Sequence, residues 1–211
     1  MLMKHTLPPT TSPKRTAGRP RAFEREAALG TAMELFWRHG FDGTSTSQLT
    51  TAMGISPPSL YAAFGSKDAL YREAVTHYLK KYGEFFSGPM SQSCTAREAL
   101  ERVLLGAAKQ FGQTAPAPGC MVACGELFTS PDNALLKRES AERRQENEHA
   151  IRARLEAARK SGELSTATDT ATLAAYYAMV IQGMAVQARD GATPAKLKRM
   201  AQLAMEAWPS C

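Results

Sequence analysis

Basic side chains at the start of the chain could contact a polyanion. Residues 1–22 contain five Lys and Arg residues and no acid, so they carry five of the six net positive charges of the 211-residue chain. They end in Gly18-Arg19-Pro20-Arg21. Arginine beside proline in an extended chain suits the narrow minor groove of duplex DNA, where the negative potential is enhanced. The alternative is that residues 1–22 form a solvated basic tail.

Hydroxyl-bearing and basic side chains recur in residues 44–67, whose pattern is typical of two short helices joined by a tight turn. Gly54 lies at the turn, where a positive φ is usually needed. Ser45 or Thr46 suits the N-cap of the first helix, and Ser56 suits that of the second. The pattern predicts a helix-turn-helix, which places its second helix in the major groove of DNA.

The side chains expected to reach DNA come from this motif and from the basic arm. Ser59 and Tyr61 are placed to reach phosphates or bases, and Lys67 begins the next helix beside the DNA backbone. Ala62 and Ala63 offer only methyl groups, which can touch thymine methyls. Specificity is therefore expected to depend partly on DNA shape and on the arm. The predicted DNA-binding residues are Arg19, Arg21, Thr44, Thr46, Pro57, Ser59, Tyr61, Ala62 and Lys67.

Apolar residues at helical spacing predict an all-α chain of about nine helices that position these side chains. The segment 132–160 is heavily charged, so one side of that long helix is expected to face water. Besides the two short helices, we expect helices at 23–39, 67–86, 95–113, 132–160, 169–189 and 193–208, a loop at 87–93 and a short apolar segment at 120–128.

Residues 23–80 resemble the N-terminal DNA-binding domain of the tetracycline-repressor (TetR) family of bacterial transcription regulators. Pro58 departs from the family pattern, because many members have Gly there, and Ala62 and Ala63 stand where many have bulkier side chains. The resemblance implies a flexible basic arm over 1–22, a helix-turn-helix domain over 23–68 and a helical effector-binding and dimerisation domain over 69–211. It rests on Leu35-Phe36, His39-Gly40-Phe41, Thr44, Gly54-Ile55-Ser56, Leu60-Tyr61, Phe64, Ser66-Lys67 and Leu70.

In this family the C-terminal domain encloses a small-molecule pocket, so the resemblance implies one here. Each candidate could equally belong to the core of the domain. As a group they suggest a largely apolar or aromatic effector, with tyrosine hydroxyls as polar contacts. The candidates are Tyr82, Phe86, Leu104, Phe111, Met121, Phe128, Tyr177 and Met179.

The segments 169–189 and 193–208 are apolar and rich in alanine, which suits close approach of helices. In the TetR family the last two helices commonly build a four-helix dimer interface, and the resemblance implies the same here. The alternative is that both helices are simply core. The predicted interface residues are Ile181, Met184, Leu197, Met200, Ala204 and Trp208.

Catalytic and metal-binding patterns do not emerge from the sequence. It has no Gly-rich phosphate loop, no His-Glu-x-x-His motif and no nucleophile elbow, and its four histidines are far apart. We therefore expect no enzyme activity, no metal and no cofactor. Cys120 and Cys124 are interpreted as two buried small residues or, alternatively, as a redox pair. With four scattered cysteines, no signal peptide and no apolar run of membrane-spanning length, a reducing cytoplasm is expected.

Taken together, these observations predict a homodimeric repressor that binds double-stranded operator DNA of palindromic sequence and is released by a small, largely apolar effector. One alternative is a thiol-based redox-sensing regulator that uses Cys120 and Cys124. An alternative of another class is a helical ligand-binding protein or enzyme without operator affinity.

Overall fold

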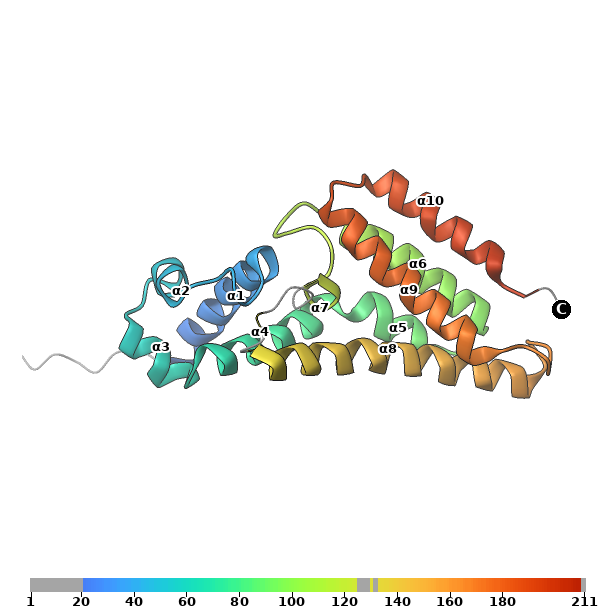
Figure 1. The fold of residues 1–211 in the computed structure, drawn as a ribbon, viewed down its shortest axis with the longest axis horizontal. Helices are drawn as coiled ribbons and strands as arrows, with labels where there is room; N and C mark the ends of the chain where they lie inside the picture. The colour runs from blue at the N-terminus through green and yellow to red at the C-terminus, as the bar shows by residue number, and fades with distance from the viewer. Residues whose placement is uncertain (1–20, 125–129, 131–132, 210–211) are drawn as a thin grey trace, which may run out of the picture.

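The computed structural model describes residues 21–124, 130 and 133–209, and the side chains from residue 25 onward. Every regular element within these residues is helical, which confirms the predicted all-α class (Figure 1). The helices are α1 (Arg21–His39), α2 (Thr46–Met53), α3 (Pro57–Phe64), α4 (Lys67–Tyr82), α5 (Glu84–Ser91), α6 (Ala96–Phe111), α7 (Met121–Cys124), α8 (Ala134–Ser161), α9 (Thr170–Arg189) and α10 (Pro194–Ala204), followed by a 3₁₀ turn (Met205–Ala207).

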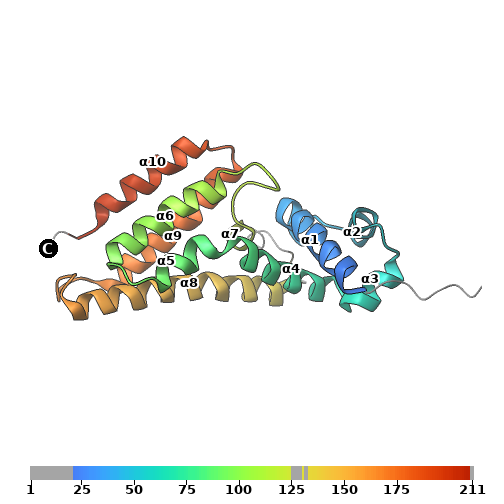
Figure 2. The same cartoon turned by 180° about the vertical axis from the view of Figure 1, so that it is seen from behind.

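Helices α1, α2 and α3 form a small head at one end of the molecule, and both views show α4 leaving it toward the larger helical body (Figures 1 and 2). The predicted turn is present, because Gly54 has a φ of 65° and ends α2. Ser45 caps α2 in a capping box with Gln48, and Ser56 caps α3. These caps satisfy backbone N–H groups that short helices cannot satisfy themselves.

A buried aromatic cluster joins α1 to α4 and holds the head together. The Phe36 and Tyr71 rings meet edge to face with centroids 5.1 Å apart, and the Trp37 and Tyr78 rings meet similarly at 4.9 Å. Leu60 of α3 is buried in the same core. Edge-to-face aromatic pairs add about 0.5–1.5 kcal/mol beyond the area that they bury. The orientation of α3 is therefore fixed by a rigid α1–α4 pair.

The expected loop at 87–93 is wrong over most of its length, since α5 continues to Ser91 after a break at Gly83. The Phe85 ring packs edge to face on Phe111 of α6, with centroids 5.3 Å apart. A Cβ added at Gly106 would lie 3.0 Å from the Phe85 Cβ atom, so the two helices approach closely. This tertiary packing outweighs the low helix propensity of Gly88 and Pro89.

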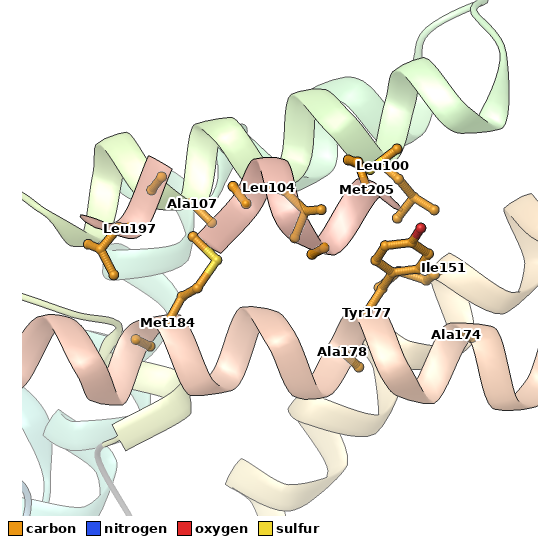
Figure 3. Close-up of a cluster of buried hydrophobic side chains, with 14 of the residues drawn as sticks. Leu100, Leu104, Ala107, Ile151, Ala174, Tyr177, Ala178, Met184, Leu197 and Met205 are labelled. Carbon is orange, nitrogen blue, oxygen red and sulfur yellow. The ribbon is translucent and has the colours of Figure 1, made fainter. Parts of the chain in front are cut away.

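The C-terminal body encloses a second core among α6, α8, α9 and α10. In Figure 3 the Met184 side chain points from α9 toward Ala107, and the Tyr177 hydroxyl points toward Leu100 and Met205. Long α8 lies along α9 and extends back toward the head in both views (Figures 1 and 2). None of the described helices has both the length and the apolar character needed to cross a bilayer.

The short helix α7 connects the two cores. Met121 and Val122 pack in the core of the head, whereas Ala123 packs in the core of the body. Gly119 leads into α7 with a φ of 78°, and a Cβ there would lie 2.6 Å from the Ala185 carbonyl oxygen. Only glycine fits this approach without a shift of α9.

Candidate nucleic-acid interface and internal cavity

The exposed side of α3 carries four of the predicted DNA-binding residues, namely Pro57, Ser59, Tyr61 and Ala62. Tyr61 is 47% exposed although it belongs to an otherwise well-packed head. The inner side of the helix buries Leu60, so α3 presents a fixed, polar-edged surface to solvent. A helix held in this way can enter a DNA major groove without reorganising.

Thr44 is a correction to the predicted interface. Its side chain is fully buried, and its hydroxyl donates to the Gly40 carbonyl oxygen at 2.7 Å. The hydroxyl therefore closes the turn after α1 and does not reach a phosphate. Thr46, which begins α2, is half-buried, and its position at a helix N-terminus stays compatible with a phosphate contact.

Two basic residues lie near the C-terminal end of α3. The Lys67 ammonium nitrogen lies 4.1 Å from the centroid of the Phe41 ring, at the start of α4. The Arg25 guanidinium stacks over the Phe64 ring at 4.6 Å and donates to both carboxylate oxygens of Glu73 at 2.8 Å. The cation–π contacts and the Arg25–Glu73 ion pair orient these side chains and leave the exposed side of α3 uncovered.

The predicted arm falls mostly outside the part of the chain that the structure describes. Arg19 lies outside it, and so do the Arg21 side chain, the pocket candidate Phe128 and Cys211. For Arg21 only the backbone is placed, as the first residue of α1. The roles assigned to Arg19 and Arg21 therefore stay predictions.

A small cavity of about 40 Å³, partly open to solvent, lies in the C-terminal body and is lined by residues of α5, α6, α8 and α9 and of the α7 region. Its apolar wall includes the rings of Phe85, Phe86 and Phe111. Its polar wall comes from Arg144 and Asn147 of α8 and from Gln182 of α9, with Cys120 beside α7; the remaining lining residues are Val122, Ala123, Ile151, Ala178 and Ile181.

Of the predicted pocket residues, Phe86 and Phe111 line this cavity. The other candidates among the described residues do not line it, for two physical reasons. Leu104, Met121 and Tyr177 are fully buried in the two cores, and Tyr82 packs on the Trp37 ring with centroids 5.1 Å apart. Met179 is 61% exposed on the outer side of α9. The expected tyrosine contacts are absent from the cavity lining, where amide and guanidinium groups stand instead.

The residues missed at the cavity, Arg144 and Asn147, have a recognisable sequence signal. They lie seven and four residues before Ile151, on the side of α8 that also buries Leu136. Polar residues at these positions lie beside the apolar stripe, where Arg144 is half-buried and Asn147 forms the exposed edge of the cavity. The sequence interpretation treated all the charges of this helix as one solvated face, and so it overlooked them.

Three of the six residues predicted for the dimer surface are buried, which corrects their assignment, and the interface itself stays a prediction. Met184, Leu197 and Ala204 are buried within the core of their own chain, where α9, α10 and α6 meet (Figure 3). Ile181 lines the cavity, and Met200 and Trp208 are half-buried. The large apolar side chains left exposed on these two helices are Met179, Val186 and Leu203. Each lies only one or two residues from a predicted residue along the chain, which places it on another side of the helix.

Cys120 and Cys124 lie at the junction of the two cores, and both thiols are free. Burial raises the pKa of the Cys120 thiol and that of the Cys124 thiol above their ordinary range. Burial and the adjacent Cys120 raise the pKa of the Tyr78 hydroxyl. The described residues contain no group of three or more His, Cys, Asp or Glu side chains able to hold a metal ion.

Polar contacts tie the head to the body around this junction. Arg189, the last residue of α9, donates to the carbonyl oxygens of Trp37 at 3.2 Å and Arg38 at 2.9 Å. Arg72 of α4 donates to both carboxylate oxygens of Glu139 on α8, at 3.0 and 2.9 Å. A displacement of α8 or α9 therefore acts directly on α1 and α4, the two helices that carry the head.

Comparisons with known proteins agree with this geometry. The model of a family described as "Bacterial regulatory proteins, tetR family" matches residues 28–74. The HTH-type transcriptional repressor ComR of Escherichia coli (strain K12) is 30% identical over 197 residues, which cover 93% of this chain and 94% of that protein. The HTH-type transcriptional repressor BdcR of the same organism is 38% identical over 113 residues, 54% of this chain and 57% of that protein.

A solved structure is similar over almost the whole chain. It contains a cysteine mutant of the TetR family transcriptional regulator CifR in complex with 26-bp double-strand operator DNA. The two sequences are 38% identical, and the match covers 91% of this chain and 100% of that one, with a TM-score of 0.86.

Proposed function

The chain belongs to the TetR family of bacterial regulatory proteins, and from this premise we propose that it is a homodimeric repressor that leaves a palindromic operator when a small molecule occupies the internal cavity. DNA binding and transcription regulation follow from the relatives, which are named repressors and regulators rather than enzymes. The proposal goes beyond the relatives in three respects: the homodimer, the palindromic operator and the small-molecule effector.

The observation that carries the proposal is the exposed side of α3 with Ser59 and Tyr61 on it. The helix is capped by Ser56 and anchored by buried Leu60 and Phe64, so its outer side chains have fixed positions. CifR, which is similar in fold and sequence, is bound to operator DNA in its solved complex. A fixed helix of this kind suits one half-site of an operator.

Two recognition helices are needed to read a palindrome, and this is the reason for proposing a dimer. The exposed apolar side chains of α9 and α10, Met179, Val186 and Leu203, provide a surface for a second copy. This surface is remote from α3, which leaves both heads accessible to DNA (Figures 1 and 2).

The proposed release from DNA depends on the cavity lying beside the segments that connect the body to the head. Cavity residues Cys120, Val122 and Ala123 belong to the α7 region, which packs on the head core, and Arg189 links α9 to the end of α1. A ligand that binds better to the conformation with misplaced heads shifts the population away from the operator-bound state.

Selection of bound fragments from random duplex DNA tests the proposal. We expect enrichment of a two-fold symmetric sequence by the full chain, and none by a Ser59→Ala/Tyr61→Ala variant that retains its melting temperature. A variant with Thr76→Ala on the exposed part of α4 serves as the matched control and should select the wild-type sequence. Enrichment of DNA fragments without two-fold symmetry would contradict the proposal that a homodimer binds a palindromic operator.

A further inference from the structure

The cavity contains a cation, Arg144, that has no acidic partner in the part of the chain that the structure describes. Arg144 lines it and forms no ion pair within 4.0 Å among the described residues. Of the nearby acids of α8, Glu142 and Glu146 are exposed and Glu148 is half-buried, and none of the three is part of the cavity lining. A partly buried positive charge in an aromatic-lined space is costly unless something neutralises it.

The hydrogen bond that Arg144 does form is a weak substitute for a carboxylate. One terminal nitrogen of its guanidinium donates to the Val122 carbonyl oxygen at 3.2 Å, at the long end of the usual range. A guanidinium has five N–H donors and pairs best with a planar anion that accepts two of them. Asn147 and Gln182 bring further amide groups to the same cavity.

The remaining lining limits the size and shape of a ligand. The rings of Phe85, Phe86 and Phe111 form an apolar wall, and the volume of about 40 Å³ is far below that of a pocket for a drug-sized molecule. A ligand that fits must therefore be small, and it must combine an apolar part with a polar end.

We propose that the cavity binds a small carboxylate, with its carboxylate on Arg144 between Asn147 and Gln182 and its short alkyl chain against the phenylalanine wall. The charge of Arg144 selects an anion, its planar fork favours a carboxylate, and the aromatic wall excludes strongly hydrated inorganic anions. This replaces the largely apolar effector with tyrosine contacts that the sequence suggested.

The contact between Arg144 and the Val122 carbonyl oxygen explains how a ligand in the cavity would change the packing of the head. A carboxylate on Arg144 competes for the donor that now holds the Val122 carbonyl oxygen. Val122 packs in the core of the head together with Met121 and Tyr78. Loss of the Arg144 contact therefore loosens α7 at the point where it supports α4. This step rests on the proposed repressor function, whereas carboxylate binding itself does not.

Calorimetric titration of the full chain with acetate, propionate and butyrate, each paired with its neutral amide, tests the inference. We expect saturable binding of at least one carboxylate and weaker binding of its amide by about tenfold or more. An Arg144→Gln variant should bind the carboxylate about tenfold or more weakly than the wild type does. The control, Arg143→Gln, removes the adjacent charge outside the cavity lining and should bind the carboxylate as tightly as the wild type does.

Two results would overturn the inference. One is the absence of saturable binding for all three carboxylates at millimolar concentration. The other is equal carboxylate affinity of the wild type and a folded Arg144→Gln variant, with folding checked by its melting temperature. Operator affinity is measured separately on selected DNA, so a chain that binds carboxylate but no operator would contradict the repressor function and leave this inference standing.

Discussion

The ammonium nitrogen of Lys67 lies 4.1 Å from the centroid of the Phe41 ring, so the first residue of α4 contacts the turn that follows α1. This contact places a positive charge beside the recognition helix and restricts its motion. A long, flexible side chain loses less entropy on binding a phosphate if it is already ordered. The contact thus connects the packing of the head to its affinity for DNA.

Replacement of Lys67 by alanine should weaken DNA binding on specific and non-specific sequences alike. One phosphate contact fewer lowers the slope of log K against log salt by roughly one. The lost cation–π contact should reduce the free energy of unfolding by only about 0.5–1 kcal/mol. Fluorescence anisotropy over a salt series measures the slope, and Lys80→Ala, at the exposed far end of α4, is the control. An unchanged non-specific affinity would show that Lys67 does not contact phosphate.

The basic arm should add affinity that depends on the sequence flanking the operator. An Arg19→Ala/Arg21→Ala variant should bind less tightly, most strongly where A·T-rich flanks narrow the minor groove. A Lys4→Ala/Lys14→Ala variant removes the same charge farther from α1 and should show a smaller loss. Competition assays with A·T-rich and G·C-rich flanks measure the difference. Equal losses for the two variants on both flanks would mean that the arm acts as a solvated basic tail.

The exposed apolar residues of α9 and α10 should hold the dimer together. Met179 is 61% and Leu203 64% exposed, so glutamate at both positions is tolerated in the monomer but places charges in an apolar interface. Sedimentation at micromolar concentration should give twice the 22.9 kDa chain mass for the wild type and the single mass for Met179→Glu/Leu203→Glu. Leu135→Glu, an exposed leucine of α8, is the matched control. A dimeric double variant would place the interface elsewhere.

The link between Arg189 and the end of α1 should contribute to stability and to coupling. Its guanidinium donates to the Trp37 and Arg38 carbonyl oxygens, which are the negative end of the α1 dipole. Arg189→Ala should lower the free energy of unfolding by about 1–2 kcal/mol, since hydrogen bonds from a charged group are lost at a partly exposed position. Urea unfolding measures this loss. Arg199→Ala, exposed on α10, should change stability little.

The local sequence was sufficient to predict the head, because its structure depends on short-range signals. Ser45, Gly54 and Ser56 act through caps and a turn that involve neighbours only a few residues away. The sequence predicts that Thr44 contacts phosphate, but the side chain is buried. Its burial depends on a hydrogen bond to the Gly40 carbonyl oxygen and on packing, neither of which the residue type reveals. Hydroxyl-bearing residues near a helix start are favourable both as caps and as ligands.

The cavity and the dimer surface could not be predicted residue by residue. Apolar residues at helical spacing show which side of a helix is buried but not what covers it, so Met184 and Met179 were not distinguishable by type. The helix α5 was missed because Gly88 and Pro89 oppose helix formation locally, and only its packing on α6 overcomes this. Such features depend on contacts between distant segments.

The buried thiols give the protein a pH dependence that also tests the redox alternative. Burial raises the pKa of Cys120 and of Cys124, so the folded state favours the protonated thiol more than the unfolded state does. This stabilisation is fully present below the unfolded pKa of about 8.5 and is lost as the pH rises through the higher folded values. The thiolate, which is the reactive form, is therefore scarce at neutral pH.

We expect the wild type to lose stability above about pH 8.5 more steeply than a Cys120→Ala/Cys124→Ala variant, by at most about 1.4 kcal/mol per pH unit for each thiol. Urea unfolding at several pH values measures the difference, and Cys94→Ala serves as the control for removal of a thiol outside the junction. Hydrogen peroxide at neutral pH should leave the operator complex intact, because burial raises the pKa of both thiols and so disfavours the reactive thiolate. Peroxide-driven release that disappears in a Cys120→Ser/Cys124→Ser variant would instead establish the thiol-based regulator. The raised pKa values favour an operator complex that peroxide leaves intact, since oxidation requires the thiolate and burial disfavours the thiolate.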